Sequence, residues 1–165
     1  AQMARTYSEQ GLSVLILVTQ VRHGQIVAGL LPEAILLTGQ DKSDFRGETL
    51  DALRDKSQLI VIATTLADEG LDIPALDVLI LAGAGKSETR ALQRIGRALR
   101  KTKSKTQAII IDFLDQARFL DIHSRRRMEI YQTESEFEVS LAEGFEGIGA
   151  SQSGQRDLLQ GAKRR

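Results

Sequence analysis

The sequence contains no cysteine and no tryptophan, and aromatic residues make up only 4% of its 165 residues. Without cysteine there is no disulfide framework, no cysteine-ligated zinc or iron site and no thiol nucleophile. The absence favours an intracellular compartment. Because aromatic side chains are few, Leu, Ile, Val and Ala must fill the interior. The remaining composition, 42% hydrophobic and 27% charged, is that of an ordinary globular protein.

Net charge is also absent, since 22 basic residues balance 22 acidic ones. An anionic partner must therefore be held by a local patch and not by the overall field. No apolar run approaches the roughly 20 residues of a membrane span. The run 12–18 is followed by Thr19, Gln20 and Arg22, which do not form a small-residue cleavage site. We expect neither a membrane anchor nor a signal peptide.

Short runs rich in Val, Ile and Leu recur along the chain. They cover residues 13–18, 34–37, 59–63, 78–81 and 108–111. Each run is apolar on both faces, as in strands that are buried on both sides of a parallel sheet. Helical patterns lie at 21–31, 45–56, 87–99 and 115–133. This alternation predicts an α/β fold, an open parallel sheet flanked by helices in three layers, with right-handed crossovers. It does not determine the strand order.

The apolar stripes of the helices predict which side chains reach the core. They are Val27, Leu30 and Leu31, then Leu50 and Leu53, then Ala117, Leu120, Ser124, Met128 and Tyr131. The run Arg125 to Arg127 is predicted to be a solvated helix face. We divide the chain into an N-terminal helix or linker (1–12), one domain with its C-terminal helix (13–133) and a flexible tail (134–165) rich in Gly, Ser and Gln.

Small polar residues follow four of the predicted strands, and an aspartate ends the fifth. They are Thr19 and Gln20, then Thr38, Gly39 and Gln40, then Thr64 and Thr65, then Gly83 to Lys86, and Asp112. Ligands of open α/β sheets bind beyond the carboxyl ends of the strands. Hydroxyl, amide and glycine N–H groups are neutral donors that suit phosphate oxygens, so a row of them could follow a nucleic-acid backbone. The alternative is that Thr, Gly and Gln simply make good turns.

The segment 83–87 resembles a phosphate-binding P-loop but fails its spacing, because Ile80 stands where the motif needs its first glycine. Lys86 and Ser87 could still meet a phosphate at a helix N-terminus. The two histidines, His23 and His123, are isolated and predict no metal site.

The predicted helix at 89–100 carries the most informative pattern in the chain. Gln93, Arg97 and Arg100 share one face, opposite a stripe of Leu92, Ile95 and Leu99. Gly96 costs about 1 kcal/mol in a helix relative to Ala, so something is expected to approach the backbone there. Two guanidinium groups on one face could act as arginine fingers on a γ-phosphoryl group. The alternative is a solvated basic face.

Two long segments, 62–74 (IATTLADEGLDIP) and 93–100 (QRIGRALR), resemble motifs V and VI of superfamily-two helicases. Residues 15–20 look like motif IV, and 37–39 look like the turn that follows it. The resemblance covers about residues 13–113 and implies the second RecA-like lobe. The step at Lys86 and Ser87 and the helix with His123, Arg126 and Tyr131 look most like phage recombination-repair helicases and the excision-repair DNA helicases.

The resemblance implies a role for each matching residue. Arg97 and Arg100 would contact the γ-phosphate of ATP with Gln93 at the same interface, Gly70 and Asp72 would contact the nucleotide, and Thr19, Gln20, Gly39, Thr64, Thr65 and Lys86 would bind the nucleic acid. There are departures from the DEAD-box RNA helicases. Gln93 stands where those enzymes have His, and Asp68 and Glu69 precede Gly70 where they usually carry Arg. These differences argue against that branch.

The chain has no Walker A loop and no Asp-Glu pair of the kind that holds Mg²⁺ in a first lobe. The resemblance therefore implies that ATP with Mg²⁺ is held mainly by a separate first RecA-like lobe, and the start at Ala1 suggests an excised C-terminal lobe. We expect the second motor lobe of an ATP-dependent DNA helicase or translocase, inactive alone. It would act on single-stranded or branched DNA in repair or recombination, in the cytoplasm of a bacterial or phage-infected cell or at the nucleoid.

Two alternatives remain open. One is a stand-alone nucleic-acid-binding module, which would use the basic residues between Arg94 and Lys105 for salt-sensitive binding. The other is a self-contained nucleotide-binding enzyme that uses residues 83–87.

Overall fold

A computed structural model describes most of the chain. The described residues are 1–64, 76–83, 108–114, 120–133, 137–142, 159–160 and 163–164. Among them, no helix is long and apolar enough to cross a lipid bilayer.

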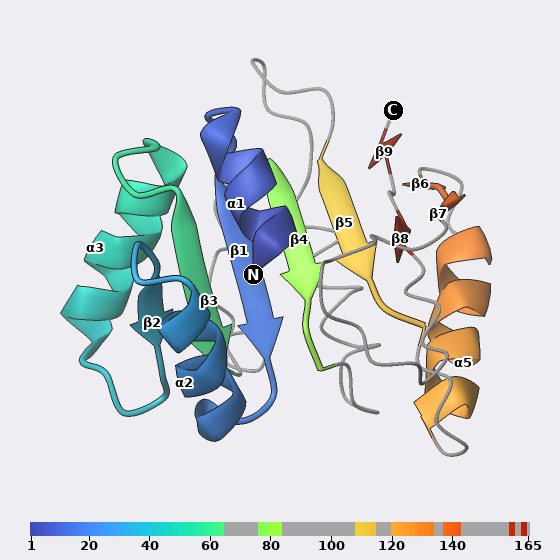
Figure 1. The fold of residues 1–165 in the computed structure, drawn as a ribbon, viewed down its shortest axis with the longest axis horizontal. Helices are drawn as coiled ribbons and strands as arrows, with labels where there is room; N and C mark the ends of the chain where they lie inside the picture. The colour runs from blue at the N-terminus through green and yellow to red at the C-terminus, as the bar shows by residue number, and fades with distance from the viewer. Residues whose placement is uncertain are drawn as a thin grey trace.

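Five parallel strands form the main sheet, in the order β2-β3-β1-β4-β5. They are β1 (Val14–Val18), β2 (Ile35–Leu37), β3 (Ile60–Thr64), β4 (Val78–Leu81) and β5 (Ile109–Asp112). Their arrows all point the same way in Figure 1, so the carboxyl ends of all five strands meet at one edge of the sheet. The predicted parallel sheet is confirmed, and the structure supplies the strand order.

Helices cover both faces of this sheet. They are α1 (Gln2–Glu9), α2 (Val21–Leu30), α3 (Ser43–Arg54) and α5 (Leu120–Thr133). Helices α1 and α2 pack on one face, whereas α3 and the side chain of Tyr131 from α5 pack on the other. The predicted three-layer arrangement is therefore confirmed. The helix predicted at 87–99 lies outside the described residues.

Side chains of β1 alternate between two apolar clusters. Leu15 and Leu17 pack with Leu53 of α3, while Ile16 packs with Val27 of α2. All five residues of β1 are buried. The strand needs apolar residues at every position because both of its faces are covered. This explains the continuous apolar runs in the sequence.

One predicted core residue is wrong. Leu30 of α2 is 59% exposed, whereas its neighbours Val27 and Leu31 are buried. The helix ends at Leu30, and the backbone of Leu31 is no longer helical, with φ −133°. The change of backbone direction turns Leu31 inward and leaves Leu30 on the outer side. In α3, the predicted core residues Leu50 and Leu53 are both buried.

The N-terminal helix α1 lies against the sheet. Ala4 is fully buried in the cluster shared with α2. Arg5 Nε donates a 2.8 Å hydrogen bond to Glu33 Oε1, and Arg5 Nη2 donates to the carbonyl of Leu30 at 3.0 Å. Within the predicted tail, β6 (Phe137–Glu138) pairs with β9 (Lys163–Arg164), and β7 (Leu141–Ala142) pairs with β8 (Leu159–Gln160). The predicted domain boundaries remain a prediction.

At the amino edge of the sheet, Asp77 joins three segments. Its Oδ2 accepts hydrogen bonds from the Ser13 N–H at 2.9 Å and the Ser13 hydroxyl at 3.0 Å, and it lies 2.9 Å from Lys56 Nζ. Lys56 has φ 65°, a left-handed conformation that is uncommon for a residue with a side chain. These contacts fix the start of β1 relative to the start of β4.

Candidate functional site

The strand-end residues that were singled out in the sequence lie along the carboxyl edge of the sheet. Val18 pairs with Thr64, and Leu17 pairs with Leu81, so these strands end at similar heights. In spatial order the edge carries Gly39 after β2, Thr64 on β3, Thr19 and Gln20 after β1, Gly83 after β4 and Asp112 on β5. Residues far apart in the chain therefore form one row.

At the centre of this row, β1 leads directly into α2. Thr19 and Gln20 are exposed, and Gln20 is the N-cap of α2 with extended backbone and no side-chain capping bond. The first N–H groups of a helix have no partner within the helix. The start of α2 therefore adds backbone donors to the hydroxyl of Thr19 and the amide of Gln20.

The turn after β2 is held by its own side chains. Asp41 Oδ2 accepts hydrogen bonds from the Thr38 N–H at 2.6 Å and from the Thr38 hydroxyl at 2.9 Å. Gly39 is exposed, and a Cβ atom built on it would meet nothing within 4 Å. The tip of the turn is thus open at Gly39, while the donors of Thr38 are already engaged.

Thr64 is the last residue of β3 and is only 3% exposed. The structure therefore places it in the predicted row but covers its side chain. Its assignment as a phosphate contact remains a prediction.

Gly83, which follows β4, lies close to the start of α2. It has φ +115°, and a Cβ atom built on it would lie 3.3 Å from His23 Nδ1 and 3.6 Å from Thr19 Oγ1. For His23 the sequence predicted only that it forms no metal site, and its position at this edge was not predicted. A signal was available, because His23 follows the N-cap Gln20 by three residues and so lies in the first turn of α2.

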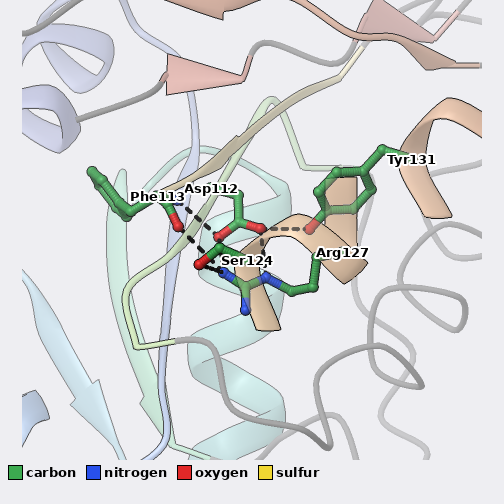
Figure 2. A network of polar contacts seen from close by, with 5 residues as sticks. All are labelled: Asp112, Phe113, Ser124, Arg127 and Tyr131. Carbon is green, nitrogen blue, oxygen red and sulfur yellow. Dashed lines mark hydrogen bonds and ion pairs between the residues drawn. The ribbon is translucent and has the colours of Figure 1, made fainter. Parts of the chain in front are cut away.

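A buried polar network ends the row at β5, as Figure 2 shows. Arg127 of α5 donates from Nε to Asp112 Oδ2 at 2.7 Å and from Nη2 to Asp112 Oδ1 at 3.1 Å. The hydroxyl of Tyr131 donates to Asp112 Oδ2 at 2.8 Å. Nη2 of Arg127 also contacts the Phe113 carbonyl at 3.2 Å and the Ser124 hydroxyl at 3.4 Å. The network ties α5 to the last strand.

The prediction of a solvated Arg125–Arg127 face is wrong for Arg127, which is 2% exposed, and holds for Arg125 and Arg126, which are exposed. Arg127 lies three residues after Ser124 and four before Tyr131, on the helix face turned toward the sheet. Ser124 and Tyr131 are buried there as predicted. The buried aspartate compensates the buried guanidinium.

The remaining predicted site residues lie outside the described residues. They are Thr65, Gly70, Asp72, Lys86, Gln93, Arg97 and Arg100. Over the part of the chain that the structure describes, no group of three or more His, Asp or Glu side chains could hold a metal ion.

Comparison with known proteins identifies related sequences. The family model described as the helicase conserved C-terminal domain matches residues 2–102. The DNA 3'-5' translocase XPB2 of Sulfurisphaera tokodaii is 30% identical over 128 residues, which cover 78% of this chain and 28% of that protein. The ATP-dependent rRNA helicase rrp3 of Emericella nidulans is 30% identical over 139 residues, which cover 81% of this chain and 30% of that protein. This chain spans less than a third of the length of either relative.

Solved structures share the fold. The crystal structure of T4 UvsW matches with a TM-score of 0.64 at 22% identity, over 79% of this chain and 31% of that chain. At this identity the similarity concerns the fold alone. It confirms the prediction of a RecA-like open parallel sheet.

Proposed function

Because the chain belongs to the C-terminal domain family of superfamily-two helicases, we propose that it is the second motor lobe of an ATP-dependent DNA helicase or translocase. ATP with Mg²⁺ would be held mainly by a first RecA-like lobe. From this lobe, Arg97 and Arg100 would reach the γ-phosphate as arginine fingers, with Gln93 at the same interface. Gly70 and Asp72 would contact the nucleotide.

The observation that supports a grip on nucleic acid is the row of neutral donors at the carboxyl edge. Thr19, Gln20 and Gly39 are exposed there, and the first turn of α2 adds backbone N–H groups. Neutral donors of this kind bind phosphate oxygens and carry no information about base sequence. Thr64, Thr65 and Lys86 would extend the row. The lobe would therefore hold the backbone of a strand and not read its bases.

The proposed cycle needs both lobes. Phosphoryl transfer depends mostly on positioning and on stabilising the charge of the transferred group. ATP would draw Arg97 and Arg100 across the cleft, and closure would shift the phosphate grip of this lobe relative to the grip of the first lobe. Hydrolysis would release the closed state, and repeated cycles would move the motor along the strand.

DNA is proposed as the substrate because of the departures from the DEAD-box pattern at Gln93 and at Asp68 and Glu69. One relative is named as a DNA translocase and another as an rRNA helicase. Competition between single-stranded DNA and RNA of the same sequence for the purified chain tests this choice. Preference for RNA would contradict it.

The finger assignment is tested in the full-length protein with Arg97→Ala. We expect the variant to lose ATPase activity by about 10³-fold or more and to bind DNA within a few-fold of the wild type. Arg126→Ala is the matched control, because it removes the same charge from an exposed position on another helix, α5. ATPase near the wild-type rate in Arg97→Ala would refute the assignment.

The isolated 165-residue chain provides a second test. We expect it to hydrolyse no ATP and to bind single-stranded DNA with an affinity that falls steeply with salt. ATP hydrolysis by the chain alone would favour the self-contained nucleotide-binding enzyme. Unchanged DNA binding by the full-length protein with and without ATP would favour the stand-alone binding module.

A further inference from the structure

The network around Asp112 lies outside the segment that the family model matches, which ends at residue 102. It is nevertheless buried at the same sheet edge as the donor row. Asp112 is 5% exposed and Arg127 is 2% exposed. A buried charge pair is a costly way to attach a helix, because apolar residues of similar volume often serve as well or better. The use of charged groups at this place therefore requires a reason.

The position of Asp112 relative to the donor row indicates that reason. Asp112 pairs with Leu81 of β4, and Leu81 pairs with Leu17 of β1. Because neighbouring strands lie about 4.8 Å apart, the end of β5 is about 10 Å from the end of β1. This separation is comparable with the Debye length of about 10 Å at 0.1 M salt. An uncompensated carboxylate at Asp112 would therefore repel a phosphate held beside Thr19.

Arg127 compensates the negative charge of Asp112 and so removes this repulsion. Its guanidinium contacts both oxygens of the carboxylate, and Tyr131 donates to one of them, as the dashed lines in Figure 2 show. A bidentate pair holds the two charges close together, so their combined field falls off quickly with distance. The same guanidinium group binds the carbonyl of Phe113, which fixes the chain just beyond β5.

We propose that Arg127 is a positioning residue for the phosphate-binding edge, since it neutralises Asp112 and so removes a buried negative charge from beside the exposed donors of β1 and α2. The proposal rests on the proposed function of that edge. It makes α5 an electrostatic part of the binding lobe. Arg127 itself does not contact the nucleic acid.

The proposal is tested with Asp112→Asn in the complete 165-residue chain. This variant keeps the side-chain shape and removes the negative charge of Asp112. We expect a lower midpoint of thermal unfolding together with an affinity for a fluorescent single-stranded oligonucleotide that is about two- to tenfold higher at 50 mM salt. The gain should fade above about 0.3 M salt, where screening is stronger. A purely structural network would lower stability and affinity together.

Two further variants complete the experiment. Asp112→Asn combined with Arg127→Met removes both charges, and its affinity should lie within about twofold of the wild type. Arg126→Met removes a charge from the exposed side of the same helix, and we also expect its affinity to stay within about twofold. An Arg126→Met effect as large as that of the buried pair would overturn the proposal, because it would show that only overall charge matters.

The outcomes separate this proposal from the proposed function. Failure of the wild-type chain to bind the oligonucleotide at 50 mM salt would refute the grip on nucleic acid, and this proposal with it. Binding by the wild type with unchanged or weaker binding by Asp112→Asn would refute only the role of Arg127.

Discussion

Gly24 provides a sharp test of how closely α2 packs on the sheet. A Cβ atom built on Gly24 would lie 2.8 Å from Leu36 Cδ1 and 3.3 Å from Val18 Cγ2. The methyl of Leu36 lies at the end of a flexible side chain, but Val18 is a short branched residue inside β1. Replacing Gly by Ala in a helix gains up to about 1 kcal/mol, whereas overpacking a core costs about 1–3 kcal/mol. We expect Gly24→Ala to destabilise the protein by about 1 kcal/mol.

Gly29 in the same helix is the matched control, because a Cβ atom built on it would meet nothing within 4 Å. Gly29→Ala should stabilise the protein by about 0.4–1 kcal/mol. Urea unfolding of both variants measures the two free energies, and about 1 kcal/mol corresponds to a shift of about 2–4 °C in Tm for a chain of this size. If both variants shift stability in the same direction, close packing is not the reason for glycine at position 24.

Four more variants test other parts of the structure. Leu53→Ala, at a fully buried site, should cost about 2–5 kcal/mol in urea unfolding, whereas the exposed Leu30→Ala should change stability by less than about 0.5 kcal/mol. Gly83→Ala must adopt φ +115°, so it should cost about 1–3 kcal/mol and weaken oligonucleotide binding in a salt titration. The hydrogen bond from Arg5 holds the pKa of the Glu33 carboxyl below its usual value. This pair therefore stabilises the fold above the unfolded pKa of about 4.3, and the stabilisation is lost as the pH falls through the lower pKa of the folded protein. The free energy of unfolding of Glu33→Gln should therefore depend less on pH between about 3 and 5 than that of the wild type.

The strands were predictable because their signal is local. Each strand of the five-stranded sheet lies in a short apolar run between turn residues and overlaps its predicted run with end shifts of one residue at most, as for β3 at Ile60–Thr64. The short strands β6 to β9 were not predicted. The helix at Val21–Leu30 was visible from its stripe. The end of this helix was not predictable, because the place where the chain leaves the helix, at Leu31, depends on where β2 begins. The start of β2 is set by the packing of the sheet.

Contacts between distant segments were beyond the reach of local patterns. The burial of Arg127 depends on Asp112, which is 15 residues away, and the sequence around Arg127 is strongly basic on its own. The approach of Gly83 to His23 spans 60 residues and requires β1 and β4 to be neighbours. The missing information was the packing of α5 against the end of β5 in the first case and the strand order in the second. Once it is known, the end of each strand has defined neighbours, and the donor row follows.

The same strand order explains why the proposed site lies at this edge. In the sequence, β1 is followed by α2 and β2, yet in the sheet β1 stands between β3 and β4. The chain therefore goes from β1 toward β2 on one side and from β4 toward β5 on the other, so that the two strand-to-strand paths diverge between β1 and β4. Thr19 and the first turn of α2 lie at this divergence, where their donors are exposed. A nucleic-acid backbone that passed there would meet the ends of several strands at once, and the pairing of Asp112 with Arg127 at the end of the row would affect how strongly it is held.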